Sequence, residues 1–216
     1  MARKREGNRI RMESLETLDR ALRVLKALPL SPRGATVSEL AAATGINRTT
    51  TMRILVTLQD HGLVTWDADT GRYSLGMGIL ELASGFFAGN ELVQVALPCL
   101  EALRDASRET VSLYVRDGTE RVCVQRVESL QPVRISVALG QRLPLYRGAS
   151  GKLLLAYLRE DQREAILERV PLDAASRDRL RAELVAIRQA GYATSFGERQ
   201  PEIASLAVPV RRRSGT

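Results

Sequence analysis

The sequence has few of the residues that usually carry catalysis or hold metal ions. Its 216 residues include a single histidine, His61, and two cysteines, Cys99 and Cys123. A Ser-His-Asp triad needs a histidine beside its nucleophile, so none can be built from the residues that follow His61. The sequence also lacks clustered ligands with metal-site spacing. We therefore expect no metal, no other cofactor and no catalysis, and an enzyme is the first alternative to be set aside.

Thiols and long apolar runs are scarce as well. Two cysteines without a ligand cluster indicate buried apolar side chains in a reducing compartment, with a disulfide or redox switch as the alternative. No apolar run is long enough to span a bilayer, and no signal-peptide segment follows the basic start Met1-Ala2-Arg3. These features predict a cytoplasmic protein that does not contact a membrane.

Positive charge, in contrast, is in excess. The chain has 32 Lys and Arg against 25 Asp and Glu, for a formal net charge of +7. A basic protein attracts phosphate polyanions or anionic lipid. Part of the excess lies in a polar leader over residues 1–12, which is either a solvated tail or an arm that contacts DNA.

Residues 13–76 carry the pattern of a winged helix-turn-helix. A leucine stripe at positions 15, 18, 22 and 25 predicts an amphipathic helix, with Ser14 as its N-cap. Thr36 and Glu39 form a capping-box pattern before a short helix over 37–43, which Gly45 ends. A third helix follows Asn47 and stops at Gly62. Two strand-like runs, 63–66 and 73–75, flank an Asp/Gly-rich turn and predict a hairpin.

The third helix is the candidate for reading DNA. Its apolar stripe at Ile54, Leu55 and Leu58 must face the core, so the first turns point outward, where the second helix of this motif meets base edges. Arginine pairs with guanine, and threonine contacts bases, phosphates or a thymine methyl. The alternative is that these side chains only solvate a surface helix. The predicted DNA-binding residues are Arg48, Thr49, Thr50, Met52 and Arg53, with Arg72 at the hairpin turn.

The remainder of the chain predicts a linker helix and a second domain. Residues 77–90 form an apolar helix, and its exposed Leu80 and Phe86 favour a homodimer. Residues 91–216 begin with a helix over 91–107. Period-two runs at 111–116, 121–127 and 133–137 then predict an antiparallel sheet. Helices follow near 150–159, 161–169 and 176–190, and a last strand over 205–210. The fold class is therefore α+β with two domains.

Several segments together resemble the IclR family of transcriptional regulators. They are the opening helix at 14–22, the helix-turn-helix from Ser38 to Leu55, and the wing from Asp69 to Gly76. Leu143-Pro144-Leu145 with Ala149-Ser150-Gly151-Lys152 resembles the signature of the effector domain, and Gly191-Tyr192-Ala193 a later segment. The resemblance implies a GAF-like effector domain, a homodimer or dimer of dimers, a double-stranded DNA operator, and a small organic acid or aromatic effector.

The resemblance also locates an effector site, with two departures from the family pattern. Free N–H groups at Ala149, Ser150 and Gly151 suit a carboxylate, although small residues there also allow close helix packing. Glu198 keeps one carboxylate of the family's acidic pair, and Ser195 and Ser205 either face the ligand or are solvated. The family continues with a further strand where this sequence stops, so we expect the effector domain to be incomplete at its C-terminal end.

The sequence also allows an alternative to a ligand-responsive regulator. A ligand-independent architectural DNA-binding protein would also be basic and carry a winged helix. The large second domain argues against it, because an architectural protein has no need of a pocket. A ligand-dependent change in operator affinity distinguishes the two.

Overall fold

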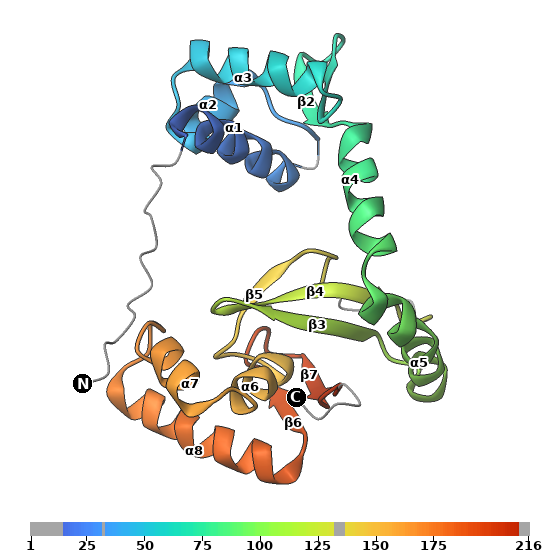
Figure 1. Cartoon of the computed structure of the whole chain (residues 1–216), viewed down its shortest axis with the longest axis vertical. Helices are drawn as coiled ribbons and strands as arrows, with labels where there is room; N and C mark the ends of the chain where they lie inside the picture. The colour runs from blue at the N-terminus through green and yellow to red at the C-terminus, as the bar shows by residue number, and fades with distance from the viewer. Residues whose placement is uncertain (1–14, 32, 132–136, 212–216) are drawn as a thin grey trace, which may run out of the picture. The chain divides into compact units, whose positions relative to one another are not determined.

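A computed structural model of the chain describes residues 15–31, 33–131 and 137–211 (Figure 1). The predicted leader 1–12, the Ser14 cap and residues 133–136 of the predicted strand lie outside these residues, and Val137, the last residue of that strand, is described but is not in a strand. The chain divides into two compact units, Met1–Gly89 and Asn90–Thr216, which we call unit 1 and unit 2. No described helix combines the length and the apolar character needed to cross a membrane.

Unit 1 is the predicted winged helix-turn-helix followed by the linker helix. Its elements are α1 (Glu16–Ala27), the 3-10 turn η1 (Leu28–Leu30), α2 (Val37–Thr44), α3 (Arg48–Asp60), β1 (Val64–Asp67), β2 (Arg72–Leu75) and α4 (Met77–Ala88). The capping box is confirmed, since Thr36 and Glu39 bond each other's backbone N–H. Gly45 ends α2 at φ 69°, where a residue without Cβ avoids strain.

The core of unit 1 differs from the predicted leucine stripe of α1. Leu18 and Leu22 are exposed, and Val24 and Leu28 are the fully buried side chains of this segment. They pack with Leu40 of α2 and Leu55 of α3. Because α1 meets both helices, its buried face lies beside the predicted stripe. Leu25 still packs against the core, whereas Leu18 and Leu22 are left on an apolar outer face. The N-cap falls on Leu15, which has no capping side chain.

A close backbone approach fixes the start of α4 against the end of α3. Gly78 N–H donates to the carbonyl of Gly62 at 2.9 Å, and Gly76 N–H donates to that of Leu63 at 2.9 Å. A Cβ at Gly76 would lie 2.3 Å from the Gly62 carbonyl oxygen, so only glycine fits there. The linker helix is therefore joined rigidly, at its first turn, to the segment that follows the predicted recognition helix.

Unit 2 is an α+β domain with two small antiparallel sheets. After α5 (Glu91–Ser107), the strands β3 (Val111–Asp117), β4 (Glu120–Val127) and β5 (Arg142–Pro144) pair in that order. The helices α6 (Ala149–Ala156), α7 (Glu160–Leu167) and α8 (Ala174–Ala190) follow, as predicted. The strands β6 (Ala193–Phe196) and β7 (Ala204–Ala207) form the second sheet.

Three sequence predictions for unit 2 need correction. Residues 142–144 were not predicted as a strand but form β5, which pairs with the start of β4. The last strand begins one residue before its expected start and ends at Ala207, so Val208 to Val210 lie outside it. Cys99, expected to be buried, is exposed on α5, whereas Cys123 is buried.

The core of unit 2 gathers around α6. Leu153 and Leu155 pack with Leu167 of α7 and Leu184 of α8, and all four are at most 4% exposed. On its other side α6 contacts β3, β4 and the second sheet. The first turn of α6 therefore lies where both sheets and the loop after β5 meet, which places the predicted effector residues among them.

Candidate DNA-binding surface and effector site

Helix α3 presents two opposite faces. Thr51, Ile54, Leu55 and Leu58 are buried, as the apolar stripe predicts. Asn47 caps the helix, and its side chain accepts a 2.8 Å hydrogen bond from the Thr50 N–H. Arg48, Thr49 and Arg53 are exposed, Met52 is 43% exposed, and Thr50 is half-buried. The predicted DNA-binding residues of α3 thus lie together on the outer face of its first two turns.

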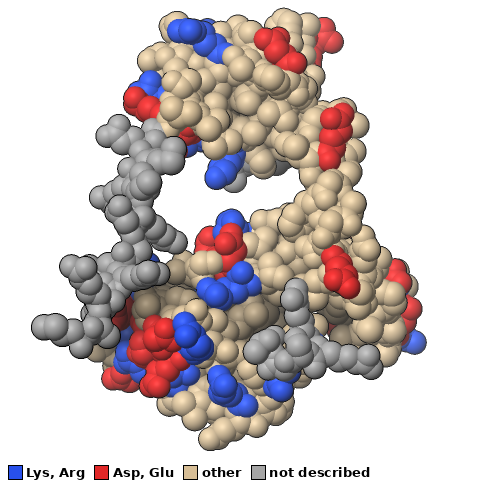
Figure 2. Space-filling model, in the orientation of Figure 1, with Lys and Arg blue, Asp and Glu red and all other residues tan. Residues whose placement is uncertain are grey.

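The arginines of α3 differ from most others in the protein. Within the described part of the chain, neither the Arg48 nor the Arg53 side chain makes an ion pair or hydrogen bond. In unit 2, acidic and basic side chains lie next to one another on the face seen in Figure 2, and Arg181 bonds both Glu164 and Asp178. Many charges of unit 2 are therefore paired locally, whereas α3 leaves two neighbouring cations for an external anion.

Arg72 has a different environment. Its guanidinium donates to both carboxylate oxygens of Glu39, at 3.0 and 3.1 Å, and to the carbonyl of Gly34 at 2.8 Å. The Thr36 backbone N–H and the Arg72 guanidinium hold the pKa of Glu39 below its ordinary value. Arg72 thus ties β2 to the start of α2. It lies at the first residue of the strand after the turn.

The structure brings several predicted effector residues together at the start of α6. Gly148, at φ 75°, precedes the helix, and its N–H donates to Glu198 Oε2 at 2.8 Å. The first helical bond is made by the Lys152 N–H to the Gly148 carbonyl, so the N–H groups of residues 149–151 have no partner within the helix. Ala149 and Gly151 are buried, and Ser150 is half-buried.

The serines of the second sheet lie on neighbouring strands. Ser195 of β6 and Ser205 of β7 are directly paired, and Ser195 is buried beside the Glu198 carboxylate while Ser205 is exposed. Glu198 and Ser195 therefore belong to the cluster at α6. Ser205 lies next to the cluster but faces solvent.

Lys152 also belongs to this cluster, although it was not among the predicted effector residues. Its ammonium is buried and bonds the carboxylates of Glu183 and Glu198. Burial opposes the charge of Lys152, but the two carboxylates outweigh it, and the pKa of Lys152 is raised. Burial raises the pKa of Glu198, but the hydrogen bonds from the Lys152 ammonium and the Gly148 N–H lower it by more. The net shift of the Glu198 pKa is therefore downward. The bridge joins α6, α8 and the segment after β6.

The Lys152–Glu198 bridge predicts an acid-dependent loss of stability. Because the pKa of Glu198 is lower in the folded protein than its ordinary 4.5, the carboxylate stabilises the fold above that pH. This contribution is lost as the pH falls through the depressed value. We expect the urea midpoint to fall less between pH 6 and pH 3 in Glu198→Gln than in the wild type.

Far-UV circular dichroism at each pH measures this difference. Glu202→Gln, at an exposed residue of the same segment, is the matched control. Its urea midpoint should fall between pH 6 and pH 3 by as much as that of the wild type. An equal fall of the urea midpoint between pH 6 and pH 3 in the wild type and in Glu198→Gln would contradict the role of the bridge.

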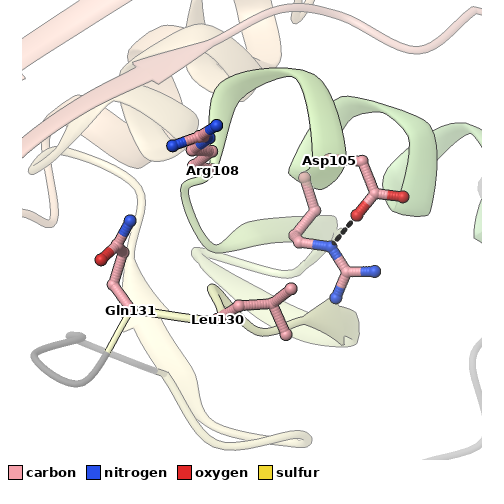
Figure 3. Close-up of a pocket in the computed structure, with 5 residues that line it drawn as sticks. Asp105, Arg108, Leu130 and Gln131 are labelled. Atoms are coloured by element: carbon pink, nitrogen blue, oxygen red, sulfur yellow. Dashed lines mark hydrogen bonds and ion pairs between the residues drawn. The ribbon is translucent and has the colours of Figure 1, made fainter.

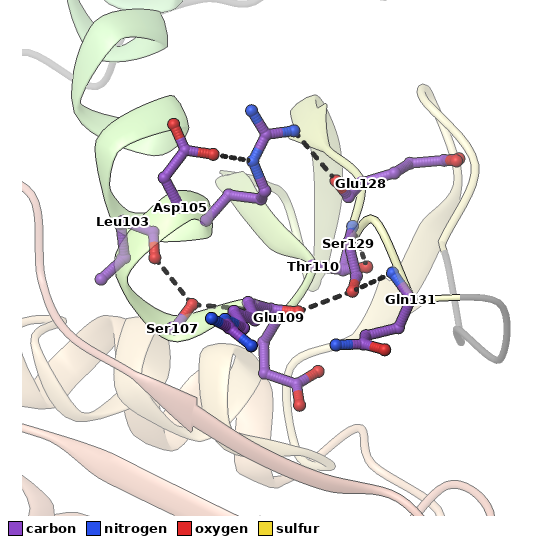
Figure 4. A network of polar contacts seen from close by, with 10 residues as sticks. Leu103, Asp105, Ser107, Glu109, Thr110, Glu128, Ser129 and Gln131 are labelled. Atoms are coloured by element: carbon purple, nitrogen blue, oxygen red, sulfur yellow. Dashed lines mark hydrogen bonds and ion pairs between the residues drawn. The ribbon is translucent and has the colours of Figure 1, made fainter.

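A separate hollow of about 300 Å³ lies at the end of α5, away from the predicted effector residues (Figure 3). Arg104, Arg108 and Leu130 are among its lining residues, and Leu130 is exposed. Ser129 Oγ donates to the Arg108 carbonyl at 2.6 Å and accepts from Gln131 N–H at 3.1 Å (Figure 4). These bonds join the end of α5 to the segment after β4, and they explain the left-handed φ of 60° at Arg108.

Comparison with known proteins agrees with this architecture. Residues 86–216 match the family described as bacterial transcriptional regulator IclR C-terminal, and residues 17–68 match the IclR helix-turn-helix domain. HTH-type transcriptional regulator KipR of Bacillus subtilis is 32% identical over 181 residues, which cover 81% of this chain and 72% of KipR. The transcriptional repressor IclR of Escherichia coli is 29% identical over 202 residues, covering 90% and 74%.

Solved structures are similar over most of their length. An IclR transcriptional regulator from Alicyclobacillus acidocaldarius is 30% identical with a TM-score of 0.82, over 94% of this chain and 84% of that one. An IclR homolog from Microbacterium hydrocarbonoxydans, complexed with 4-hydroxybenzoate, is 27% identical with a TM-score of 0.80, over 92% and 85%. The two family matches together take in both units. This chain therefore belongs to the IclR family of bacterial transcriptional regulators.

Proposed function

We propose that this regulator binds a DNA operator through α3 and changes its affinity when a small molecule binds unit 2. The observation that carries the first part is the pair of unpaired arginines, Arg48 and Arg53, on the outer face of α3. A helix of this kind enters the major groove with its first turns against the base edges. Operator binding requires the compartment that holds the chromosome, so we place the protein in the cytoplasm.

Each predicted residue receives a role from its position. Arg48 and Arg53 donate to guanine edges or phosphates, and Thr49 and Met52 contact bases beside them. Thr50 is half-buried at the helix start, where it approaches the DNA backbone. Since Arg72 is held by Glu39, we assign it the support of the wing, with a phosphate contact as its secondary role.

The effector site of this proposal is the first turn of α6. The N–H groups of Ala149, Ser150 and Gly151 lack helical partners and lie at the positive end of the helix dipole. Glu198 and Ser195 flank them from the second sheet. A related protein was crystallised with 4-hydroxybenzoate. We therefore propose a small organic acid or a polar aromatic compound as the effector, bound by non-covalent contacts alone.

The experiment tests ligand-dependent operator binding. The wild-type protein selects a duplex from a random pool, and its affinity is then measured with a panel of small carboxylic acids and phenols. A compound that changes the affinity supports the proposal and excludes the architectural alternative. Ser150→Trp should abolish that change and leave ligand-free DNA binding intact. Ser150→Ala, which keeps the space open, should still respond. A normal response in folded Ser150→Trp would place the effector elsewhere.

We further propose that the protein is a homodimer, and that it can assemble as a dimer of dimers. Helix α4 has no buried residue in the single chain, and Leu80 and Phe86 are 58% and 54% exposed. The apolar outer face of α1, with Leu18 and Leu22, is exposed in the same unit. Water-exposed apolar helices of this size mark protein interfaces, and a two-fold dimer matches a palindromic operator.

The dimer proposal predicts that a charge on the apolar face of α4 separates the protomers. Phe86→Asp should raise the dimer dissociation constant at least tenfold, because a buried unpaired carboxylate is costly. Gly85→Asp adds the same charge on a side of the helix that faces away from both Leu80 and Phe86, since each residue turns the helix by about 100°. A Cβ at this exposed glycine meets no atom within 4 Å, so the variant should leave the dimer intact. Light scattering from 1 to 50 µM measures both. A monomeric wild type at these concentrations would contradict the proposal.

A further inference from the structure

Arg121 of β4 is a buried cation that neither the DNA-binding surface nor the Lys152 bridge uses. Only 4% of the residue is exposed. Its guanidinium lies directly against the first turn of α6. A Cβ placed on Gly151 would be 2.2 Å from Arg121 Nη1, and a Cβ on Gly148 would be 3.0 Å from Nη2. The two glycines therefore make room for this guanidinium at the N-terminus of the helix.

The hydrogen bonds of Arg121 leave part of the guanidinium without a partner. Nη1 donates to the carbonyls of Pro144 and Arg147, at 2.5 and 2.6 Å, and the Tyr114 ring lies 5.5 Å from Cζ. Nε is buried and has no acceptor. Among the described residues, no carboxylate forms an ion pair with Arg121. Buried guanidinium groups are normally paired, so Arg121 keeps a buried donor that an anionic ligand could satisfy.

The surroundings of Arg121 also favour an anion. Glu198 is the nearby carboxylate, but its two oxygens already accept from Lys152 and from the Gly148 N–H. Burial lowers the pKa of Arg121, Tyr114 and Glu198 raise it, and the neighbouring Arg199 lowers it, so that the net shift is downward. The N–H groups that start α6 carry partial positive charge beside the same guanidinium. A bound carboxylate would accept from the unpartnered Nε and would place a negative charge beside this guanidinium and the first turn of α6.

We propose that Arg121 binds the carboxylate of a small monoanionic effector at the first turn of α6, and that it makes the site select acids over their neutral analogues. The inference rests on the proposed effector site and adds to it the chemical class of the ligand and the residue that selects it. A charge-assisted hydrogen bond in a desolvated site discriminates by about 10–100-fold against an analogue without the charge.

Two acid and amide pairs test this with the full chain: 4-hydroxybenzoate with 4-hydroxybenzamide, and lactate with lactamide. Titration calorimetry at pH 7 and constant ionic strength should show at least one acid binding tenfold or more tightly than its amide. Arg121→Gln should weaken that acid about 10–100-fold and leave the amide nearly unchanged. Arg116→Gln removes an exposed arginine opposite Arg121 in the sheet and should bind like the wild type.

The outcomes separate this inference from the proposed site. If Ser150→Trp abolishes acid binding but folded Arg121→Gln binds the acid like the wild type, the role of Arg121 is overturned and the proposed site still stands. Acid binding that neither variant changes would remove the site as well. Equal affinities of acid and amide for the wild type, or no acid binding at 10 mM, would overturn the inference without any variant. If Arg121→Gln does not fold, Arg121→Lys keeps the charge and should retain part of the acid preference.

Discussion

Arg53→Ala is expected to weaken operator binding about 5–150-fold, because a lost arginine contact to a base edge costs about 1–3 kcal/mol. The fold should not change, since the Arg53 side chain is exposed and makes no ion pair or hydrogen bond with the described residues. Gel shift or fluorescence anisotropy on the selected duplex measures the loss. Binding should also become less selective at one base position. Arg48→Ala should act in the same direction.

The matched control for Arg53 is Arg169→Ala. Arg169 lies in unit 2, is exposed, and its side chain makes no ion pair with another described residue. The two variants lose the same net charge, so a general electrostatic effect would weaken both equally. Unchanged operator affinity in Arg53→Ala would remove α3 as the element that reads DNA. A uniform loss across sequences, with a salt slope reduced by about one, would assign Arg53 to a phosphate instead.

Lys152→Met is expected to lower the free energy of unfolding of unit 2 by about 2–3 kcal/mol. Removing one partner of a fully buried ion pair costs about 3–5 kcal/mol. The cost is smaller here because the Glu183 and Glu198 side chains are 44% and 29% exposed and regain some hydration. Methionine fills nearly the same volume, so packing is kept and the loss reports the bridge.

Two comparisons isolate that effect. Lys26→Met makes the same replacement on the exposed end of α1 and should change stability by less than about 0.5 kcal/mol. Trp66, the only tryptophan, lies in unit 1, so its fluorescence follows that unit while circular dichroism follows both. Urea unfolding of Lys152→Met should leave the Trp66 transition in place. If unit 2 of Lys152→Met unfolds at the same urea midpoint as unit 2 of the wild type, the bridge does not stabilise the fold.

Local patterns in the sequence predicted unit 1 almost completely. The Thr36–Glu39 capping box, the Asn47 cap and Gly45 each act on backbone groups a few residues away. Their spacing in the sequence is therefore enough to predict their structural role. The stripe on α3 had the correct period and only one neighbouring core to face, and it placed Arg48 and Arg53 outside. On α1 the same reasoning held only for Leu25, because the contacts with α2 and α3 selected the face that holds Val24 and left Leu18 and Leu22 exposed.

The site in unit 2 was predicted only in part. The small residues at 149–151 and Glu198 could be found from the resemblance to a family. Lys152 belongs to the same signature but was not assigned to the site, and Arg121 was not identified at all, since a buried basic side chain has no periodic signal and is usually expected at the surface. Residues 142–144 were missed as a strand because three residues are too short for a period of two to be recognised.

The sequence by itself determined the helices, the caps at Thr36, Gly45 and Asn47, the winged helix-turn-helix and the outer face of α3, because each depends on residues one or two turns apart. Only the tertiary structure decided which charges are paired. Glu39 and Arg72 are 33 residues apart, Lys152 and Glu198 are 46 apart, and Arg121 reaches the loop before α6 across 26 residues. Such pairs form when folding removes water from both partners, and no local pattern along the chain records which partners meet.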